Sequence, residues 1–205
     1  MANENQNDEG RSHAQRRILF DDIEYYDIVV IMRSGSWCLA ALVFPMALAW
    51  ADNAHLQQRE QSFTIRLNGS VDEVSPLFGP VRETEWAPGW SPRFLHPAGG
   101  GQQEGAVFTA ASADGKERLW ILTGYAPAEG RIEYTVVAPG FTANQIKIRV
   151  ASDGPSHSDA TITYRRSALS PEGNQEVAKL DAHWAQQQRT HWEGAINQLL
   201  AKHHD

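Results

Sequence analysis

Residues 131–167 read RIEYTVVAPGFTANQIKIRVASDGPSHSDATITYRRS, and this stretch decides the fold. It contains three runs of alternating apolar and polar residues, separated by turn signals at Pro139-Gly140 and at residues 152–156. Such alternation is typical of strands that bury one face. Connections this short join antiparallel neighbours. One face of a sheet is therefore expected to carry the apolar members of the runs, which are Ile132, Tyr134, Val136, Ile146, Ile148, Val150, Ala160, Ile162 and Tyr164.

The preceding residues extend the same meander. Residues 62–69 alternate in the same way, and residues 106–112 and 117–125 flank the hairpin signal Asp114-Gly115. Residues 70–79 predict a short helix. Residues 81–105 contain three prolines and two tryptophans, and they predict an irregular segment. A long loop of this kind inside a compact domain is often functional, as a lid or as the wall of a binding site.

The C-terminal segment supplies the element that covers the apolar face. Ser170 is an expected N-cap, and Pro171 suits the first helical position. Apolar residues recur every three or four positions from Val177 to Leu199. These features predict one amphipathic helix to about Lys202, roughly 45 Å long at about 1.5 Å per residue. The fold class is therefore α+β.

This order of elements resembles the START-related SRPBCC superfamily. The similarity covers about residues 62–200 and rests on FGPVRETEWAPGWSPRFLHP, EGAVFTA, WILTGYAPAEGRIEY and YRRSALSPEGN, which are similar to an uncharacterised bacterial group of that superfamily. The resemblance implies a helix-grip fold, in which a curved antiparallel sheet wraps around the long C-terminal helix and leaves a cavity between them. Family members range from carriers to cyclases, so the fold does not fix the function.

Aromatic side chains are the candidate ligand contacts in that cavity. Trp86 and Trp90 are expected at its mouth, because a loop does not need two tryptophans for its own packing. For the other aromatic residues, simple filling of the core is the competing explanation. The full set of expected ligand-binding residues is Trp86, Trp90, Phe94, Phe108, Tyr134, Tyr164, His183 and Trp184.

The sequence contains no motif that names a reaction, a cofactor or a metal. Nucleophile-elbow, Walker, zincin and dinucleotide-binding patterns are missing. The net charge of −7 argues against nucleic-acid binding. The single cysteine excludes a multi-cysteine metal site, and His183 and His191 are about 12 Å apart along a helix, too far to share an ion. We therefore expect a small apolar molecule as the partner, with no catalytic residue, cofactor or metal.

Two other functions remain open. A cyclase or hydrolase-like enzyme would use a carboxylate or histidine in the cavity, with Glu85, His96 and His183 as the candidates. An interaction module would instead have a cavity filled by its own side chains.

The N-terminal residues predict export. Met32 and Arg33 precede an apolar run, and small residues follow it up to Ala51, which is the pattern of a secretory signal peptide. We expect residues 1–31 to be disordered and to precede the true start, 32–51 to be the signal peptide, 52–60 a linker and 61–205 the domain. The mature protein would then be periplasmic or secreted and would lack Cys38. A membrane anchor over residues 28–50 or a buried core helix are the alternatives.

Overall fold

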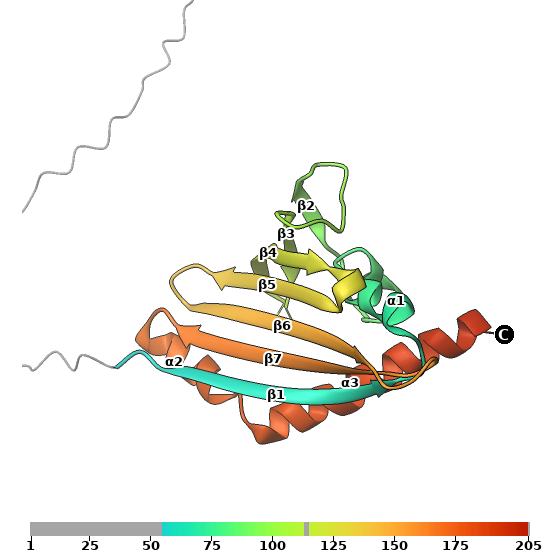
Figure 1. The fold of residues 1–205 in the computed structure, drawn as a ribbon. Coiled ribbons are helices and arrows are strands. Elements are labelled where there is room, and N and C mark those ends of the chain that lie inside the picture. The colour runs from blue at the N-terminus through green and yellow to red at the C-terminus, as the bar shows by residue number, and fades with distance from the viewer. Residues whose placement is uncertain (1–54, 113–114, 205) are drawn as a thin grey trace, which may run out of the picture. The chain divides into compact units, whose positions relative to one another are not determined.

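The chain forms a seven-stranded antiparallel sheet that curves over the C-terminal helices (Figure 1). The computed structural model describes residues 55–112 and 115–204. The strand order is β1-β7-β6-β5-β4-β3-β2, so every pair except β1–β7 is also consecutive in sequence. The strands are β1 (Gln58–Leu67), β2 (Arg93–His96), β3 (Val107–Ala111), β4 (Glu117–Ala126), β5 (Arg131–Ala138), β6 (Thr142–Ser152) and β7 (Ser158–Ala168).

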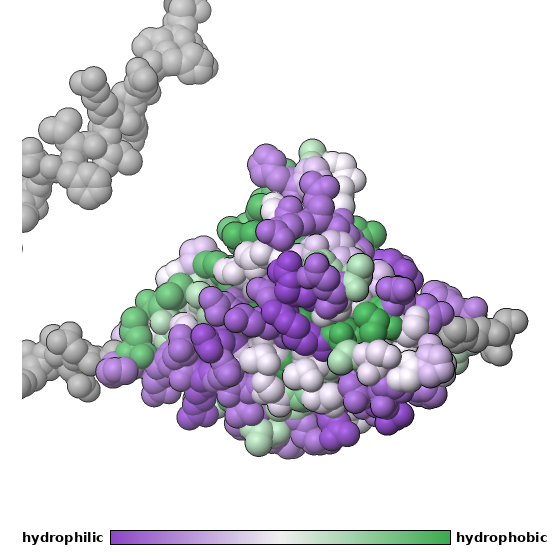
Figure 2. Space-filling model, viewed as in Figure 1, coloured by the Kyte–Doolittle hydropathy of each residue, from purple (hydrophilic) through white to green (hydrophobic). Residues whose placement is uncertain are grey.

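The alternating runs form β5, β6 and β7, as predicted, and one face of the sheet is buried. Ile132 and Ile162 have no exposed surface, whereas Lys147 and Arg165 point outward and are exposed. Seen from the outer side, the surface over β6, β7 and β1 is mostly hydrophilic (Figure 2). The expected α+β helix-grip fold class is therefore confirmed.

Two strands differ from the predicted boundaries. β1 begins at Gln58, within the expected linker, because residues from Gln58 onward pair with β7 as far as Ser167. β2 lies inside the segment expected to be irregular, where it pairs with β3. Both differences arise from partners that are distant in sequence. Of the predicted hairpin signal between β3 and β4, Asp114 lies outside the described residues.

The prediction of a single C-terminal helix was wrong: the segment forms two helices. α2 (Pro171–Ala178) begins after the predicted cap Ser170, whose hydroxyl accepts a hydrogen bond from Gly173 N at 3.3 Å. α3 (Ala182–His204) begins after Asp181, whose carboxylate accepts a hydrogen bond from Trp184 N at 2.8 Å. Between the helices Leu180 is fully buried. Burial of Leu180 and capping by Asp181 favour a change of direction at this point.

Side-chain hydrogen bonds hold α3 against the edge strand β1: the side chain of Asn197 on α3 bonds to backbone atoms at the end of that strand. Asn197 accepts a hydrogen bond from Asn68 N at 2.9 Å and donates one to Arg66 O at 2.9 Å.

Among the described residues, no helix is long and apolar enough to cross a membrane. The expected signal peptide and Cys38 lie outside the described part of the chain.

Short helical turns connect β1 to β2. α1 (Val71–Val74) and the 3-10 helix η1 (Ser75–Phe78) form the predicted short helix, and Ser70 and Glu73 form its capping box. A second 3-10 helix, η2 (Arg82–Glu85), follows, and η3 (Pro127–Glu129) joins β4 to β5. η2 and the loop after it form one wall of the cavity described next.

Candidate functional site

A cavity of about 150 Å³ lies between η2 with its following loop, the concave face of the sheet, and α3. Six aromatic side chains line it, and we call them the aromatic cage: Trp86, Trp90, Trp120, Tyr134, Tyr164 and Trp192. The remaining lining residues are Glu83, Ala87, Pro88, Ile146, Ile148 and His191. The cavity wall is therefore mainly apolar, with one carboxyl group and one imidazole.

The cage consists of two groups of rings in edge-to-face contact. In one group, the ring centre of Trp192 lies 5.2 Å from that of Trp86 and 6.4 Å from that of Tyr164. In the other, Trp120 lies 5.0 Å from Trp90 and 5.7 Å from Tyr134. Contacts of this kind are favourable and hold the rings in place.

Hydrogen bonds to the backbone satisfy the polar tips of three cage residues. Trp86 Nε1 donates to Leu77 O at 2.8 Å, Trp90 Nε1 donates to Pro80 O at 2.8 Å, and Tyr134 donates its hydroxyl proton to Phe78 O at 2.7 Å. All three acceptors lie in one short segment, residues 77–80. By contrast, the Trp120 indole nitrogen is buried and has no hydrogen-bond partner in the described part of the chain.

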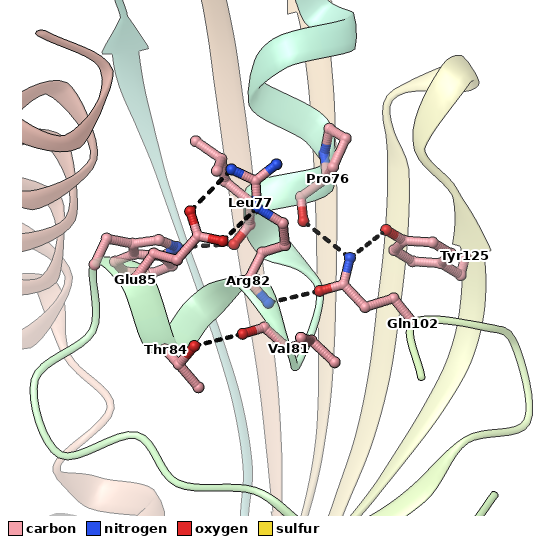
Figure 3. A network of polar contacts seen from close by, with 9 residues as sticks. Pro76, Leu77, Val81, Arg82, Thr84, Glu85, Gln102 and Tyr125 are labelled. Atoms are coloured by element: carbon pink, nitrogen blue, oxygen red, sulfur yellow. Dashed lines mark hydrogen bonds and ion pairs between the residues drawn. The ribbon is translucent and has the colours of Figure 1, made fainter. Parts of the chain in front are cut away.

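Gln102 holds η2 against the sheet through a network of hydrogen bonds (Figure 3). Its amide oxygen accepts from Arg82 N at 2.6 Å, and its amide nitrogen donates to Tyr125 Oη at 2.8 Å and to Pro76 O at 3.3 Å. Gly79 makes this possible, because a Cβ atom there would lie 2.4–2.6 Å from the Gln102 amide group. The network fixes the register of η2 and therefore the position of Glu83.

The two carboxyl side chains of η2, Glu83 and Glu85, lie in opposite environments. Glu85 is exposed and forms an ion pair with Arg82 at 2.6 Å, and this hydrogen bond lowers the pKa of Glu85. Glu83 is only 8% exposed, and none of the ion pairs among the described residues includes it. Burial raises the pKa of the Glu83 carboxyl well above its usual range, against a smaller opposing effect of a hydrogen bond with Tyr134.

Two tyrosines, Tyr134 and Tyr164, lie near Glu83. Burial raises the pKa of Tyr134 and of Tyr164, and the nearby Glu83 raises both further. Burial thus favours the neutral carboxylic acid form of Glu83 in the unliganded cavity.

Four of the eight residues expected to bind ligand line this cavity: Trp86, Trp90, Tyr134 and Tyr164. Phe108 is fully buried behind the cage, stacked 6.0 Å from Trp120, and Phe94 packs on it at 5.4 Å. Trp184 contacts Tyr164 at 4.9 Å but lines an adjoining hollow of about 460 Å³, which shares Trp120, Ile146 and Tyr164 with the cavity and is also lined by Arg166. His183 is exposed in the first turn of α3.

The candidate acid and base residues do not come together. Glu85, His96 and His183 are all exposed, on η2, β2 and α3 respectively. The cavity instead contains Glu83 and His191. The described residues also include no cluster of three or more histidine, cysteine or acidic side chains that could hold a metal ion.

Sequence reasoning missed Trp120, Trp192 and His191 as cavity residues, and of the two carboxylates that precede Trp86 it favoured Glu85 rather than Glu83. Trp192 belongs to the apolar stripe of the C-terminal segment, and Trp120 to a predicted strand, so a signal existed for both. Glu83 offers no such signal, because it is one of several charged residues in the sequence RETE.

The loop that carries Trp86 and Trp90 also has an outer side. There a groove of about 500 Å³ runs between the loop and α3 and shares Trp86, Ala87, Pro88, Trp90 and His191 with the inner cavity. The loop is thus the partition between the groove and the cavity.

No protein-family model and no curated protein matches the sequence. The chain is similar in structure to norcoclaurine synthase from Thalictrum flavum in complex with dopamine and hydroxybenzaldehyde, with a TM-score of 0.55 and 12% identity over 72% of this chain and 89% of that one. It is similar to SA2116, a protein of unknown function from Staphylococcus aureus, with a TM-score of 0.55 and 12% identity over 75% of this chain and all of that one (100%).

A third similar structure is that of the di-domain aromatase/cyclase BexL from the BE-7585A biosynthetic pathway. The TM-score is 0.52 at 16% identity, over 70% of this chain and 46% of that one. At such identities the likeness establishes the arrangement of helices and strands and leaves the activity open.

Proposed function

We propose, on the premise that the chain has the helix-grip fold of the SRPBCC superfamily, that its cavity binds an apolar molecule about the size of one aromatic ring. The observation that supports this most is the aromatic cage around a cavity of about 150 Å³.

The volume of the cavity favours a ring-sized ligand over a lipid. Pockets for drug-sized molecules have volumes of about 300–1,000 Å³, whereas an apolar cavity of roughly 150 Å³ is sufficient for benzene. In this protein Trp86 and Trp192 occupy the space between the sheet and α3 and contact Phe78 with ring centres 6.3 and 6.2 Å away. A long acyl chain would have to displace these rings.

The similar structures support a ligand of this size. The Thalictrum norcoclaurine synthase was solved with dopamine and hydroxybenzaldehyde, each of which contains a single aromatic ring. The cage offers such a ring edge-to-face and stacking partners on several sides.

Ligand-induced stabilisation tests the proposal. The full chain is heated with toluene, phenol, indole and oleate, and native mass spectrometry measures the stoichiometry of each complex. Toluene and phenol, which contain a single ring, should raise Tm and bind one per chain, since a ligand at about 100 times its Kd adds about 2.7 kcal/mol to the free energy of unfolding.

A pair of variants locates the site. Ile146→Phe fills the cavity and should abolish the shift, whereas Phe94→Ala, outside the cavity, should retain it. Stabilisation by oleate alone, or by none of the four compounds, would refute the proposal.

An enzyme is the second candidate function, because Glu83 and His191 line the same cavity. A neutral carboxylic acid in an apolar site is suited to proton donation. Turnover of a single-ring carbonyl or enol ether, monitored by NMR, should then disappear in Glu83→Gln. Binding without any turnover favours the carrier function.

We further propose that the domain is exported. The support is the order of Arg33, the apolar run and the small residues near Ala51. The intact mass of protein isolated from its own host tests this: a chain that begins near Asp52 is expected, and a chain that still contains Cys38 would instead favour a membrane anchor.

A further inference from the structure

We infer that the ligand of this cavity carries a positive charge, and that the site recognises a small ammonium compound through the Glu83 carboxylate and the aromatic cage. This inference rests on the proposed function, since it keeps the ring-sized apolar body of the ligand and adds an ammonium group to it. Two independent observations support it, the unpaired buried carboxyl and the number of aromatic faces around it.

A buried carboxyl group without a cationic partner is unusual, because a charge that leaves water needs an opposite charge. The nearest arginine in sequence, Arg82, donates instead to Glu85 at 2.6 and 2.9 Å. Among the residues that line the cavity, His191 is the only side chain able to carry a positive charge, and it is exposed on α3. An ammonium group inside the cavity would supply the missing partner.

The aromatic cage is also suited to a positively charged group. Aromatic faces attract cations that lie within about 6 Å, tryptophan most strongly, and quaternary or methylated ammonium groups are typical ligands of such cages. Four of the lining rings belong to tryptophans, Trp86, Trp90, Trp120 and Trp192. Because backbone carbonyls already hold the N–H groups of Trp86 and Trp90, their rings can offer π faces without leaving a donor unsatisfied.

Binding of a cation should be linked to loss of one proton. Burial raises the pKa of Glu83 in the unliganded cavity, so at any pH where its carboxyl holds a proton, an ammonium ion that pairs with the carboxylate displaces that proton to the solvent. The affinity for a cation should therefore rise up to tenfold per pH unit until the pKa of Glu83 is passed, whereas the affinity for a neutral ligand of the same shape should not.

The other titratable groups around Glu83 lie on β4, β5, β7, η2 and α3. Tyr134 on β5, Tyr164 on β7 and Tyr125 on β4 all have raised pKa values from burial, so they stay neutral over this range. Arg82 stays charged and paired with Glu85 on η2. His191 on α3 also lines the cavity, and His191→Gln removes its contribution.

Calorimetry with benzylamine and benzyl alcohol, which share a shape and differ in charge, tests the inference on the full chain. The titrations are made from about pH 6 to pH 8, in two buffers of different ionisation enthalpy. Benzylamine should bind at least tenfold more tightly than benzyl alcohol and release up to one proton per site, most at the lowest pH. His191→Gln should keep both properties.

Two variants of η2 form a matched pair. Glu83→Gln should reduce the benzylamine affinity to that of benzyl alcohol and abolish proton release, whereas Glu85→Gln should behave as the wild type. If Glu83→Gln does not fold, proton release by the wild type still decides the matter. Equal binding of the two probes without proton release overturns the inference and leaves the proposed function intact. Failure of both probes to bind overturns both.

Discussion

Replacing Gly79 by alanine is expected to destabilise the domain by about 2 kcal/mol, although the backbone there suits alanine. Gly79 has φ −89° and ψ 152°, a conformation open to any residue. In such a position Gly→Ala normally stabilises by about 0.4–1 kcal/mol. The added methyl group would, however, lie 2.4–2.6 Å from the Gln102 amide and force it away.

The cost follows from the three hydrogen bonds that Gln102 makes to Arg82 N, Tyr125 and Pro76 O. At about 1 kcal/mol each, their loss amounts to about 3 kcal/mol, from which the entropic gain of alanine is subtracted. Urea unfolding should show a lower midpoint at unchanged m-value. Gly99→Ala is the matched control, because no atom lies within 4 Å of its added Cβ.

A double-mutant cycle with Gln102→Ala isolates the clash. In that background Gly79→Ala should be neutral or slightly stabilising, which gives a coupling energy of about 2–3 kcal/mol. If Gly79→Ala costs no more than Gly99→Ala, or costs the same with and without Gln102, the clash with the Gln102 network is not the cause.

Three further changes have defined outcomes. Glu83 holds its proton to higher pH in the folded than in the unfolded chain, so the free energy of unfolding should fall by up to about 1.4 kcal/mol per pH unit above about pH 4.3. Glu83→Gln should remove this slope in urea unfolding across a pH series, and an unchanged slope would exclude Glu83 as its source. Leu180→Ala should lower stability by about 2–5 kcal/mol in the same assay, because the side chain is fully buried between α2 and α3. Asp181→Ala should cost about 0.5–2 kcal/mol through loss of the cap on α3, while Asp181→Asn, which can still cap, should cost less.

The proton on Glu83 links stability and binding. The Glu83 carboxyl destabilises the empty domain as pH rises, but it becomes a favourable partner once a cation enters the cavity. The pH dependence of unfolding should therefore weaken when benzylamine saturates the protein, and calorimetric melting with and without benzylamine measures this.

Local sequence determined most of the strands and the start of the C-terminal helical segment. Ile132, Tyr134 and Val136 alternate with polar residues, and this two-residue period can only bury one side of a sheet. Ser170 and Pro171 begin a helix through the conformations that they favour. These features depend on residues only a few positions apart, which is why the sequence alone predicts them.

Features that need distant partners were decided by the tertiary structure. β2 exists because β3 offers it hydrogen bonds, and the C-terminal segment divides because Leu180 is buried in the core. Glu83 and Glu85 are two residues apart and look equivalent in sequence, yet one is buried in the cavity and the other is exposed beside Arg82. Gln102 fixes that difference by fastening η2 from 20 residues away, and burial of a charge depends on such three-dimensional neighbours rather than on the local pattern.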